Sequence, residues 1–334
     1  MHMADALIVP AVAGVMYAAS GTAAGFSIHK IRLENDTKKI PEMGVMGAFV
    51  FAAQMINFTI PGTGSSGHLC GGMLLSALLG PQAGFLTMIG VLLIQCLLFA
   101  DGGLLALGCN VWNMAFYGCF VGSLLIWRPL MKNGASKKKI TAASIVGCML
   151  TLQMGAFSVC LETMASGVTE LPFKSFLAVM QPIHLAIGLV EGLITAAVLC
   201  FVYEARPALL WGVGEMEKAE RLSRKKTLGI LAGAAVVIAG VLSLFASALP
   251  DGLEWSMEKI AGTSELSSSG RVYEIFAAIQ DKTALLPDYS FSASDSAAGT
   301  SASGLIGGVV VVAFCAILCL LLQKVKKRKR TAVS

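Results

Sequence analysis

The sequence predicts an all-α, polytopic membrane protein, and three observations support this fold class. Hydrophobic residues make up 56% of the 334 residues and charged residues only 13%, against about 25% charged residues in soluble domains. No Asp, Glu, Lys or Arg occurs between Glu42 and Asp101, an interval longer than two helical spans of about 20 residues each. The Lys and Arg residues gather in a few segments between apolar stretches, which is typical of cytoplasmic loops.

Nine apolar segments are expected to form the membrane helices. The third is too short for a full span and lies between the turns at Pro61-Gly62-Thr63-Gly64 and Gly80-Pro81. We expect it to be tilted or partly re-entrant, which requires that protein covers its backbone. The nine segments are 6–28, 43–60, 68–80, 82–100, 104–127, 140–161, 176–203, 227–249 and 304–323.

The distribution of Lys and Arg predicts that the N-terminus lies outside the cell membrane. The inner segments 29–42, 128–139, 204–226 and 324–334 then hold 4, 5, 6 and 6 of the 25 Lys and Arg residues, and the outer segments hold the other 4. We interpret the basic tail as a stop-transfer signal and an anchor to lipid headgroups of the bilayer, in preference to a nucleic-acid binding segment.

The predicted helices fall into two groups around a charged segment. Residues 215–221, which lack Gly and Pro, predict a cytoplasmic helix, and Ser290 to Ser303, rich in Ser, Ala and Asp, predict disorder in an outer loop. The predicted parts are a seven-span body (1–204), a linker (205–226) and a two-span appendage (227–334) with the outer loop 250–303.

The N-terminus lacks the basic region that opens a cleaved signal peptide, because Lys30 is the first Lys or Arg. Met1 is therefore taken as the start of the mature chain. All nine Cys fall in apolar stretches, which favours buried thiols over disulfides.

Met1-His2 is the first candidate metal site. A histidine directly after the terminal amine offers three nitrogens: the amine, the His2 backbone amide and the His2 ring. These nitrogens close small chelate rings, and a fourth nitrogen would complete a plane that favours Ni(II) or Cu(II) over tetrahedral Zn(II). An exposed His without a role is the alternative for this pair taken alone.

His68 is the candidate fourth ligand, because the predicted topology places it on the same outer face as the N-terminus. It lies within Gly64-Ser65-Ser66-Gly67-His68-Leu69-Cys70-Gly71-Gly72, where the glycines let backbones approach closely. Thr63, Ser65 and Ser66 are candidates for orienting the His68 ring. Asp5, expected in the first turn of the first helix, would offset the positive helix end near a bound cation.

Further polar residues lie inside or beside the predicted spans. His184 and Glu191 share one helix face, and an ionisable residue within a span is a functional candidate. A buried pair that fixes helix packing is the equally weighted alternative. Asn57, Asp101 and Asn110 could line an ion path or join neighbouring helices through hydrogen bonds.

Several long stretches resemble one family of transporters. M-H-M-A-D-A-L-I at 1–8, F-V-F-A-A-Q-M-I-N-F at 49–58, G-T-G-S-S-G-H at 62–68 and F-A-D-G-G-L-L-A-L-G-C-N at 99–110 resemble the CbiM/NikM substrate-capture subunits of energy-coupling-factor (ECF) transporters for cobalt and nickel. P-D-G-L-E-W-S at 250–256 resembles the PDGLE-type small subunit, the CbiN/NikN-like partner, fused behind the linker.

The resemblance implies that Met1, His2 and His68 hold the transported Ni(II) or Co(II). It also implies two kinds of partner, a coupling transmembrane subunit and cytoplasmic ABC ATPases. The chain itself has no G-x-x-x-x-G-K-[ST] phosphate loop, so ATP hydrolysis is expected in a partner. No catalytic cofactor is expected.

We therefore expect a component that captures Ni(II) at the outer face and delivers it for ATP-driven uptake, with Co(II) as the alternative ion. A membrane-embedded metalloenzyme and a passive channel are the alternatives from other classes. The chain has no H-E-x-x-H motif, which disfavours the enzyme. A chelating site disfavours the channel, because conduction needs weak binding.

Overall fold

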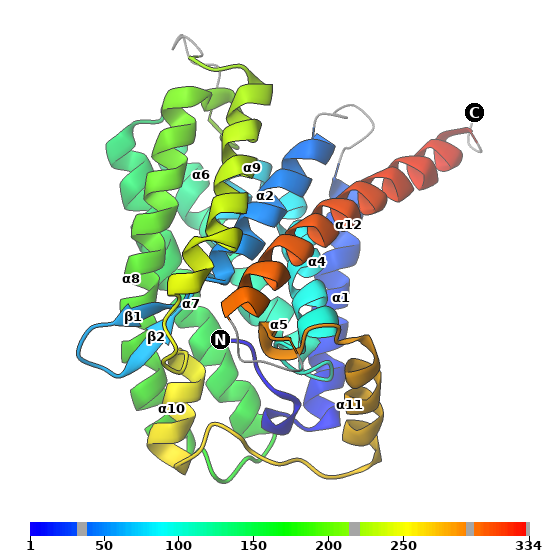
Figure 1. Ribbon diagram of the computed structural model, residues 1–334. Coiled ribbons are helices and arrows are strands. Elements are labelled where there is room, and N and C mark those ends of the chain that lie inside the picture. The colour runs from blue at the N-terminus through cyan, green and yellow to red at the C-terminus, as the bar shows by residue number, and fades with distance from the viewer. Residues whose placement is uncertain (32–38, 214–220, 292–296, 332–334) are drawn as a thin grey trace.

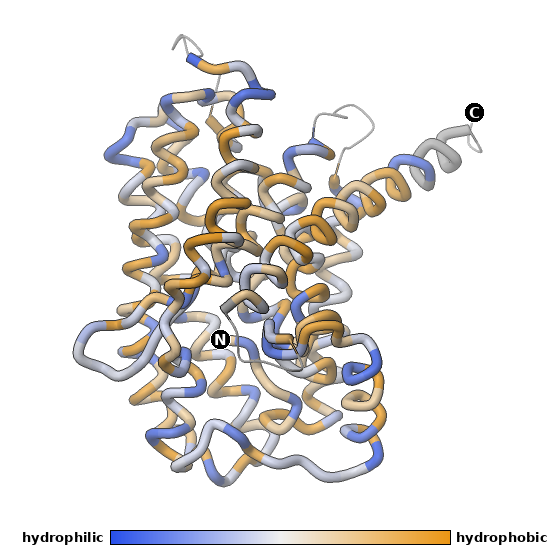
Figure 2. Tube along the Cα trace, in the orientation of Figure 1, coloured by the Kyte–Doolittle hydropathy of each residue, from blue (hydrophilic) through white to orange (hydrophobic). Residues whose placement is uncertain are grey.

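The computed structural model describes residues 1–31, 39–213, 221–291 and 297–331. Long helices run in both directions through its body (Figure 1), and apolar residues fill their middle sections while polar residues collect towards the ends (Figure 2). The prediction of a polytopic, all-α membrane protein is confirmed, with one two-stranded hairpin as the exception among the described residues.

The N-terminal part comprises residues up to Leu209. Its elements are η1 (Asp5–Leu7), α1 (Pro10–Lys30), α2 (Lys39–Gln54), β1 (Phe58–Ile60), β2 (Ser65–Gly67), α3 (Gly72–Leu79), α4 (Pro81–Phe99), α5 (Leu107–Asn110), the π-helical η2 (Val111–Trp127), α6 (Arg128–Met131), α7 (Lys137–Ala165), α8 (Phe173–Ala205) and η3 (Pro207–Leu209). The C-terminal part comprises α9 (Arg224–Gly240), η4 (Leu242–Phe245), α10 (Gly252–Ala261), α11 (Arg271–Thr283), η5 (Pro287–Tyr289) and α12 (Ala297–Thr331).

Six helices within the described residues are long and apolar enough to cross a membrane. The helices α2 and α9 have 16 and 17 residues, so they are about 24 and 26 Å long, slightly less than a hydrocarbon core of about 30 Å. The six candidates are Pro10–Lys30, Pro81–Phe99, Leu107–Met131, Lys137–Ala165, Phe173–Ala205 and Ala298–Lys324. Helices of spanning length therefore match only six of the nine expected apolar segments within the described residues.

The third apolar segment does not form a full helical span. Residues 68–71 belong to no helix or strand, and α3 adds eight residues, about 12 Å of helix. Every residue of α3 is buried. Of the non-helical segment before it, Leu69 and Gly71 are buried and His68 and Cys70 are partly buried, in keeping with the cover that a re-entrant segment requires. The expected helix 43–60 also ends early, because β1 takes Phe58–Ile60 and pairs antiparallel with β2. His68 thus directly follows the hairpin.

The C-terminal helices pack closely on the body. Added side-chain atoms at Gly44 and Gly47 of α2 would lie 3.4 and 2.8 Å from Val312 and Val311 of α12, and one at Gly90 of α4 would lie 2.4 Å from Phe314. Small residues therefore let α12 approach the body, as they do between membrane helices. The appendage expected from the sequence is part of one packed bundle (Figure 1).

The segments that connect the helices differ in part from the expectations. The predicted cytoplasmic helix at 215–221 lies almost entirely outside the described residues. The predicted disorder of Ser290 to Ser303 is wrong for its last part, since α12 begins at Ala297, and residues 292–296 lie outside the described residues. All nine cysteines are free thiols, and seven are buried, as expected for small apolar residues.

Candidate metal centre

The N-terminal segment inserts into the body, and Figure 1 shows the N-terminus near the middle of the molecule. Met1 is 5% exposed and Met3 is fully buried. The Asn110 side chain makes two hydrogen bonds to the Met3 backbone. The Met3 N–H donates to Asn110 Oδ1 (2.7 Å), and Asn110 Nδ2 donates to the Met3 carbonyl (3.2 Å). Asn110, a predicted path residue, therefore positions the segment that carries the first two candidate ligands.

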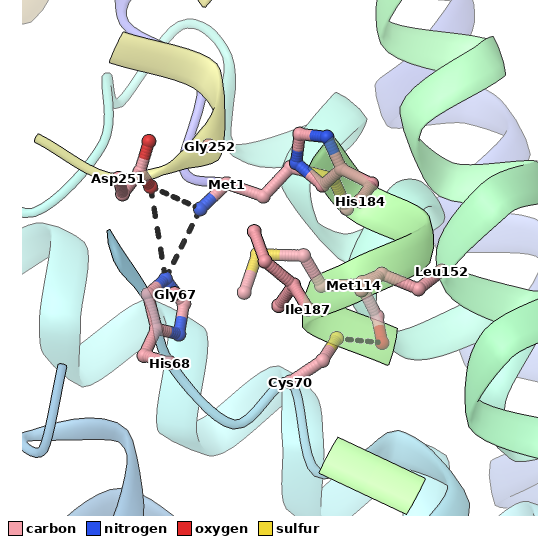
Figure 3. A pocket seen from close by; sticks show the side chains of 10 residues that line it. All are labelled: Met1, Gly67, His68, Cys70, Met114, Leu152, His184, Ile187, Asp251 and Gly252. Carbon is pink, nitrogen blue, oxygen red and sulfur yellow. Dashed lines mark hydrogen bonds and ion pairs between the residues drawn. The ribbon is translucent and has the colours of Figure 1, made fainter. Parts of the chain in front are cut away.

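The Met1 α-amine lies between two side chains (Figure 3). It is 3.0 Å from His68 Nε2 and 2.5 Å from Asp251 Oδ2. His68 Nδ1 is 3.1 Å from the Leu69 carbonyl oxygen. With the proton assigned to Nδ1 for this hydrogen bond, Nε2 presents its lone pair to the amine. The structure thus brings Met1 and His68 together across 67 positions of the chain.

The His2 ring lies beside that of His68. The two rings stack with centroids 5.4 Å apart and an interplanar angle of 16°. His2 Nδ1 is 3.1 Å from Asp101 Oδ1, and Nε2 is 3.2 Å from Gln95 Oε1. A neutral ring has a single N–H and can donate to only one of these oxygens, so the other contact is easily given up.

Burial and nearby charges act differently on the groups of this site. Burial lowers the pKa of the Met1 amine, but the charges of Asp251 and Asp101 outweigh it, and the pKa is raised. Burial lowers the pKa of His2 to about 4, so its ring is neutral near pH 7. Burial raises the pKa of Asp251, yet the amine and His68 together bring it well below its ordinary value.

The donor set fits a planar, nitrogen-rich ion site. Two nitrogens on adjacent corners of a plane, each about 2.0 Å from a metal ion, lie about 2.8 Å apart, close to the 3.0 Å between the amine and His68 Nε2. Within the described residues, no three His, Cys, Asp or Glu side chains are grouped to hold a metal ion by themselves. The Met1 amine and the His2 backbone nitrogen are further candidate donors beside the two imidazole rings.

Thr63, Ser65 and Ser66 do not contact the His68 ring, in contrast to the expectation. The Ser66 N–H and hydroxyl donate to the carbonyls of Pro250 (2.8 Å) and Leu249 (2.7 Å). The Ser65 hydroxyl also lies 3.4 Å from the Pro250 carbonyl, and the Thr63 carbonyl accepts from Trp255 Nε1 (3.0 Å). These residues fasten the C-terminal part to the hairpin that carries His68.

Asp5 and Asn57 also lie in settings that the sequence did not indicate. Asp5 belongs to the separate turn η1 and not to the first turn of α1, and its Oδ1 accepts from the Ala106 N–H (2.9 Å). It therefore secures the loop after α4 instead of opposing a helix end. The Asn57 carbonyl accepts from the Ser247 N–H (2.8 Å), another link between the two parts.

His184 and Glu191 lie on the inner face of α8. His184 lines a small cavity of about 10 Å³ together with Met1, His68 and Asp251, and its Nδ1 is 2.8 Å from the Met180 carbonyl of the preceding turn. Glu191 Oε1 accepts from the Gly71 N–H (2.9 Å), which holds the start of α3. His184 is thus beside the site, whereas Glu191 supports the chain after His68.

Two residues at the site were missed. Asp251 contacts the amine but belongs to a loop that was assigned to the outer face of a separate appendage. The feature of the sequence that could have identified it is the acidic residue within P-D-G-L-E at 250–254. Gln95 is a buried polar residue inside a predicted span; its Nε2 donates to Gln54 Oε1 (2.9 Å), and Gln54 in turn donates to the Cys70 carbonyl (2.9 Å).

A larger cavity of about 740 Å³ borders the site on the side of α10 and α11. Both parts of the chain line it, and His2, His68 and Gln54 are among the lining residues. None of the described residues that line it is Lys or Arg, and such a cavity raises the local concentration of cations. The lining carboxylates are Asp5, Asp101, Asp251, Glu254 and Asp288.

Comparison with known proteins gives matches along almost the whole chain. The family profile described as the cobalt uptake substrate-specific transmembrane region, CbiM, matches residues 2–209, and the PDGLE domain profile matches residues 225–324. A chain of Archaeoglobus fulgidus, provisionally named the fused nickel transport protein NikMN, is 36% identical over 313 residues, which cover 94% of this chain and 96% of the relative.

Two further comparisons support the same assignment. The cobalt transport protein CbiM of Geobacter sulfurreducens is 28% identical over 272 residues, which cover 79% of this chain and 75% of the relative. A crystal structure of a truncated transition metal transporter superposes with a TM-score of 0.53 at 31% sequence identity, covering 61% of this chain and 99% of that one.

Proposed function

Because the chain belongs to the CbiM family of cobalt-uptake transmembrane proteins, with a PDGLE domain behind it, we propose that it captures Ni(II) at the outer face of the cell membrane. The capture site consists of the Met1 amine, the backbone and ring nitrogens of His2, and His68 Nε2. The single observation that carries this proposal is the 3.0 Å contact between the Met1 amine and His68 Nε2 in a buried position. A chain terminus without a role is ordinarily exposed to solvent, whereas this amine is buried against an imidazole nitrogen.

The choice of nickel follows from the donor set. Four nitrogens in a plane suit Ni(II), whereas Zn(II) prefers a tetrahedron. The full-length similarity to the Archaeoglobus fulgidus protein, which is named for nickel transport, favours the same ion. Co(II) is the second candidate, and the name of the matching family profile favours it.

Delivery of the ion requires other subunits. We propose that a coupling transmembrane protein and cytoplasmic ATPases of the ECF type complete the transporter, since the chain carries no phosphate-binding loop of its own. The end of the bundle where Lys39, Arg206 and Arg224 line one cavity corresponds to the cytoplasmic face in this proposal, in keeping with the enrichment of Lys and Arg there.

The test is the metal content of the full-length purified chain after exposure to equimolar Ni(II), Co(II), Cu(II) and Zn(II). Elemental analysis is expected to find about one nickel ion per chain, with cobalt as the main competitor among transported ions. The variant His68→Ala, measured in parallel, is expected to retain little metal. A preparation that retains only zinc, or equal metal in the variant, would contradict the proposal.

A further inference from the structure

Asp251 is the residue at the capture site that the planar nitrogen set leaves without a role. Its Oδ2 is 2.5 Å from the Met1 amine and 3.8 Å from His68 Nε2, while the amine is 3.0 Å from the same ring nitrogen. The three atoms come from the N-terminus, the segment after β2 and the start of α10 (Figure 3). Their three mutual distances define the position of a fourth atom that could bind all of them.

These three atoms are arranged as ligands of one ion. A triangle with sides of 2.5, 3.0 and 3.8 Å has a centre about 1.9 Å from all three corners, close to the metal–nitrogen distance of about 2.0 Å. The angle at the amine is close to a right angle, so the centre falls on the line from Asp251 Oδ2 to His68 Nε2. An ion at this centre has the carboxylate and the imidazole opposite each other, with the amine beside both.

The chelate itself identifies the position that Asp251 takes. In the proposed four-nitrogen plane, the amine, the His2 amide and the His2 ring follow one another in order, so the amide nitrogen lies opposite the fourth ligand, His68. The carboxylate of Asp251 lies opposite His68 as well. Asp251 therefore stands where the amide nitrogen binds in the completed plane.

We propose that Asp251 is a loading ligand that receives the incoming ion with the amine and His68, and that the His2 amide nitrogen later replaces it. The inference rests on the proposed capture function. In the first step the hydrated ion loses water and bonds to the carboxylate, the amine and the imidazole, and the amine proton leaves to water. In the second step the amide proton leaves to water, the bond from the ion to the amide nitrogen forms, and the bond to the carboxylate breaks.

The order of these steps follows from the ligand chemistry. An amide N–H gives up its proton only when an ion is already held beside it, because the metal ion compensates the charge that develops on nitrogen. A carboxylate needs no such preparation and exchanges readily with bound water. Asp251 supplies a negative donor at the moment when the amide cannot, and the His2 ring completes the plane after leaving one of its two oxygen contacts.

The C-terminal part holds Asp251 ready for this role. The other carboxylate oxygen, Oδ1, caps α10 by accepting from the N–H groups of Leu253 (2.8 Å) and Glu254 (2.9 Å). The Asp251 N–H donates to Glu254 Oε2 (2.9 Å), which completes a capping box. The preceding Pro250 is tied to Ser66 on the hairpin of His68. One oxygen thus fixes the side chain and the other faces the ligands.

A different role for the same contact predicts the opposite result. If Asp251 only clamps the terminal ammonium group, its removal frees the amine and nickel enters faster. If Asp251 is the loading ligand, its removal slows entry but leaves the completed plane unchanged. Asp251→Asn separates these two roles, because Asn caps helices about as well as Asp and so preserves α10.

The experiment measures Ni(II) entry by stopped-flow absorbance of the planar nickel chromophore in the full-length chain, purified in lipid nanodiscs. Asp288→Asn is the matched control, because it removes one carboxylate from the same large cavity without touching the site. We expect Asp251→Asn to slow entry at least about tenfold, within the range for residues that support metal ligands. The control is expected to stay within about twofold of the wild type.

The final spectrum distinguishes the outcomes. A slower Asp251→Asn variant that still reaches the wild-type planar spectrum supports the loading role. Entry at the wild-type rate or faster overturns it, and so does loss of the planar spectrum, which would make Asp251 a permanent ligand. If the wild-type chain itself forms no nickel chromophore, the proposed capture site fails, and this failure is distinct from the failure of the loading step.

Discussion

Extending the N-terminus tests the capture site most directly. Four residues, Met-Gly-Ser-Gly, placed before Met1 move the free amine by up to about 13 Å, since each extended residue spans about 3.3 Å. The amine now sits 3.0 Å from His68 Nε2, and a metal–nitrogen bond is about 2.0 Å long. The cavity beside Met1 has about 10 Å³, about the space for one water molecule, so the added residues cannot be accommodated there.

The loss of affinity follows from the number of ligands removed. The extension takes away the amine and breaks the chelate ring through the His2 amide. Losing a residue that merely supports a ligand costs about 10–100-fold in metal affinity, so losing the amine itself is expected to exceed about 100-fold. This corresponds to about 2.8 kcal/mol, at about 1.4 kcal/mol for each factor of ten.

The assay is the equilibrium affinity for Ni(II), measured by competition with a chelator of known strength. The matched control carries the same four residues after Ser334 and is expected to bind like the unextended chain. Equal affinity in the two extended chains would refute the terminal chelate, whatever the role of His68.

Three further predictions follow from the same site. His68→Ala is expected to lower Ni(II) affinity by more than about 100-fold, whereas His29→Ala at the opposite end of α1 is expected to have little effect; similar losses in equilibrium titrations of the two variants would argue against the site. Affinity is expected to fall about 100-fold per pH unit from pH 8 to 6, because the raised pKa of the Met1 amine keeps it protonated and both this proton and the His2 amide proton must leave; the His2 ring, with a pKa of about 4, adds no proton in this range. Calorimetry in buffers of different ionisation heat is expected to count about two protons, and a count near zero would contradict the chelate. Deleting residues 227–334 is expected to impair nickel uptake by cells more than equilibrium binding, because all four proposed nitrogens lie in the remaining part; intact uptake by the shortened chain would show that the C-terminal part is dispensable.

Much of the fold can be predicted from the sequence, because only a few backbone structures are stable in a bilayer. An uncharged interval such as that between Glu42 and Asp101 has no stable place outside a membrane or a large core. The short third segment was recognised from its length and flanking glycines. The strands at 58–60 and 65–67 were not recognised. The first, Phe58–Ile60, continues an apolar stretch that also suits the end of a helix, and the second, Ser65–Gly67, has the composition of a turn.

The candidate site was predictable only where topology brings residues to one face. The sequence placed His2 and His68 near each other through the alternation of spans. The same topology also puts Asp251 on the outer face, within the loop 250–303, but its contact with the amine depends on how that loop folds back. The contacts of Gln95 depend on how two helices face each other. For Ser65 and Ser66, proximity to His68 in the sequence suggested a contact with its ring, yet their hydrogen bonds point to the C-terminal part instead.

The buried N-terminus also has a consequence for how the protein is made. The two partners of the Met1 amine lie 67 and 250 positions further along the chain, and the Met3 backbone is held by Asn110. Residues 1–3 are made before all of these partners, and the complete set of contacts, which includes Asp251, can form only after residue 251 has been synthesised. Closing a loop between such distant residues is slow compared with forming a local helix turn. The amine therefore waits for its last partner, Asp251, until late in synthesis, and until then it is open to the enzymes that process new chains.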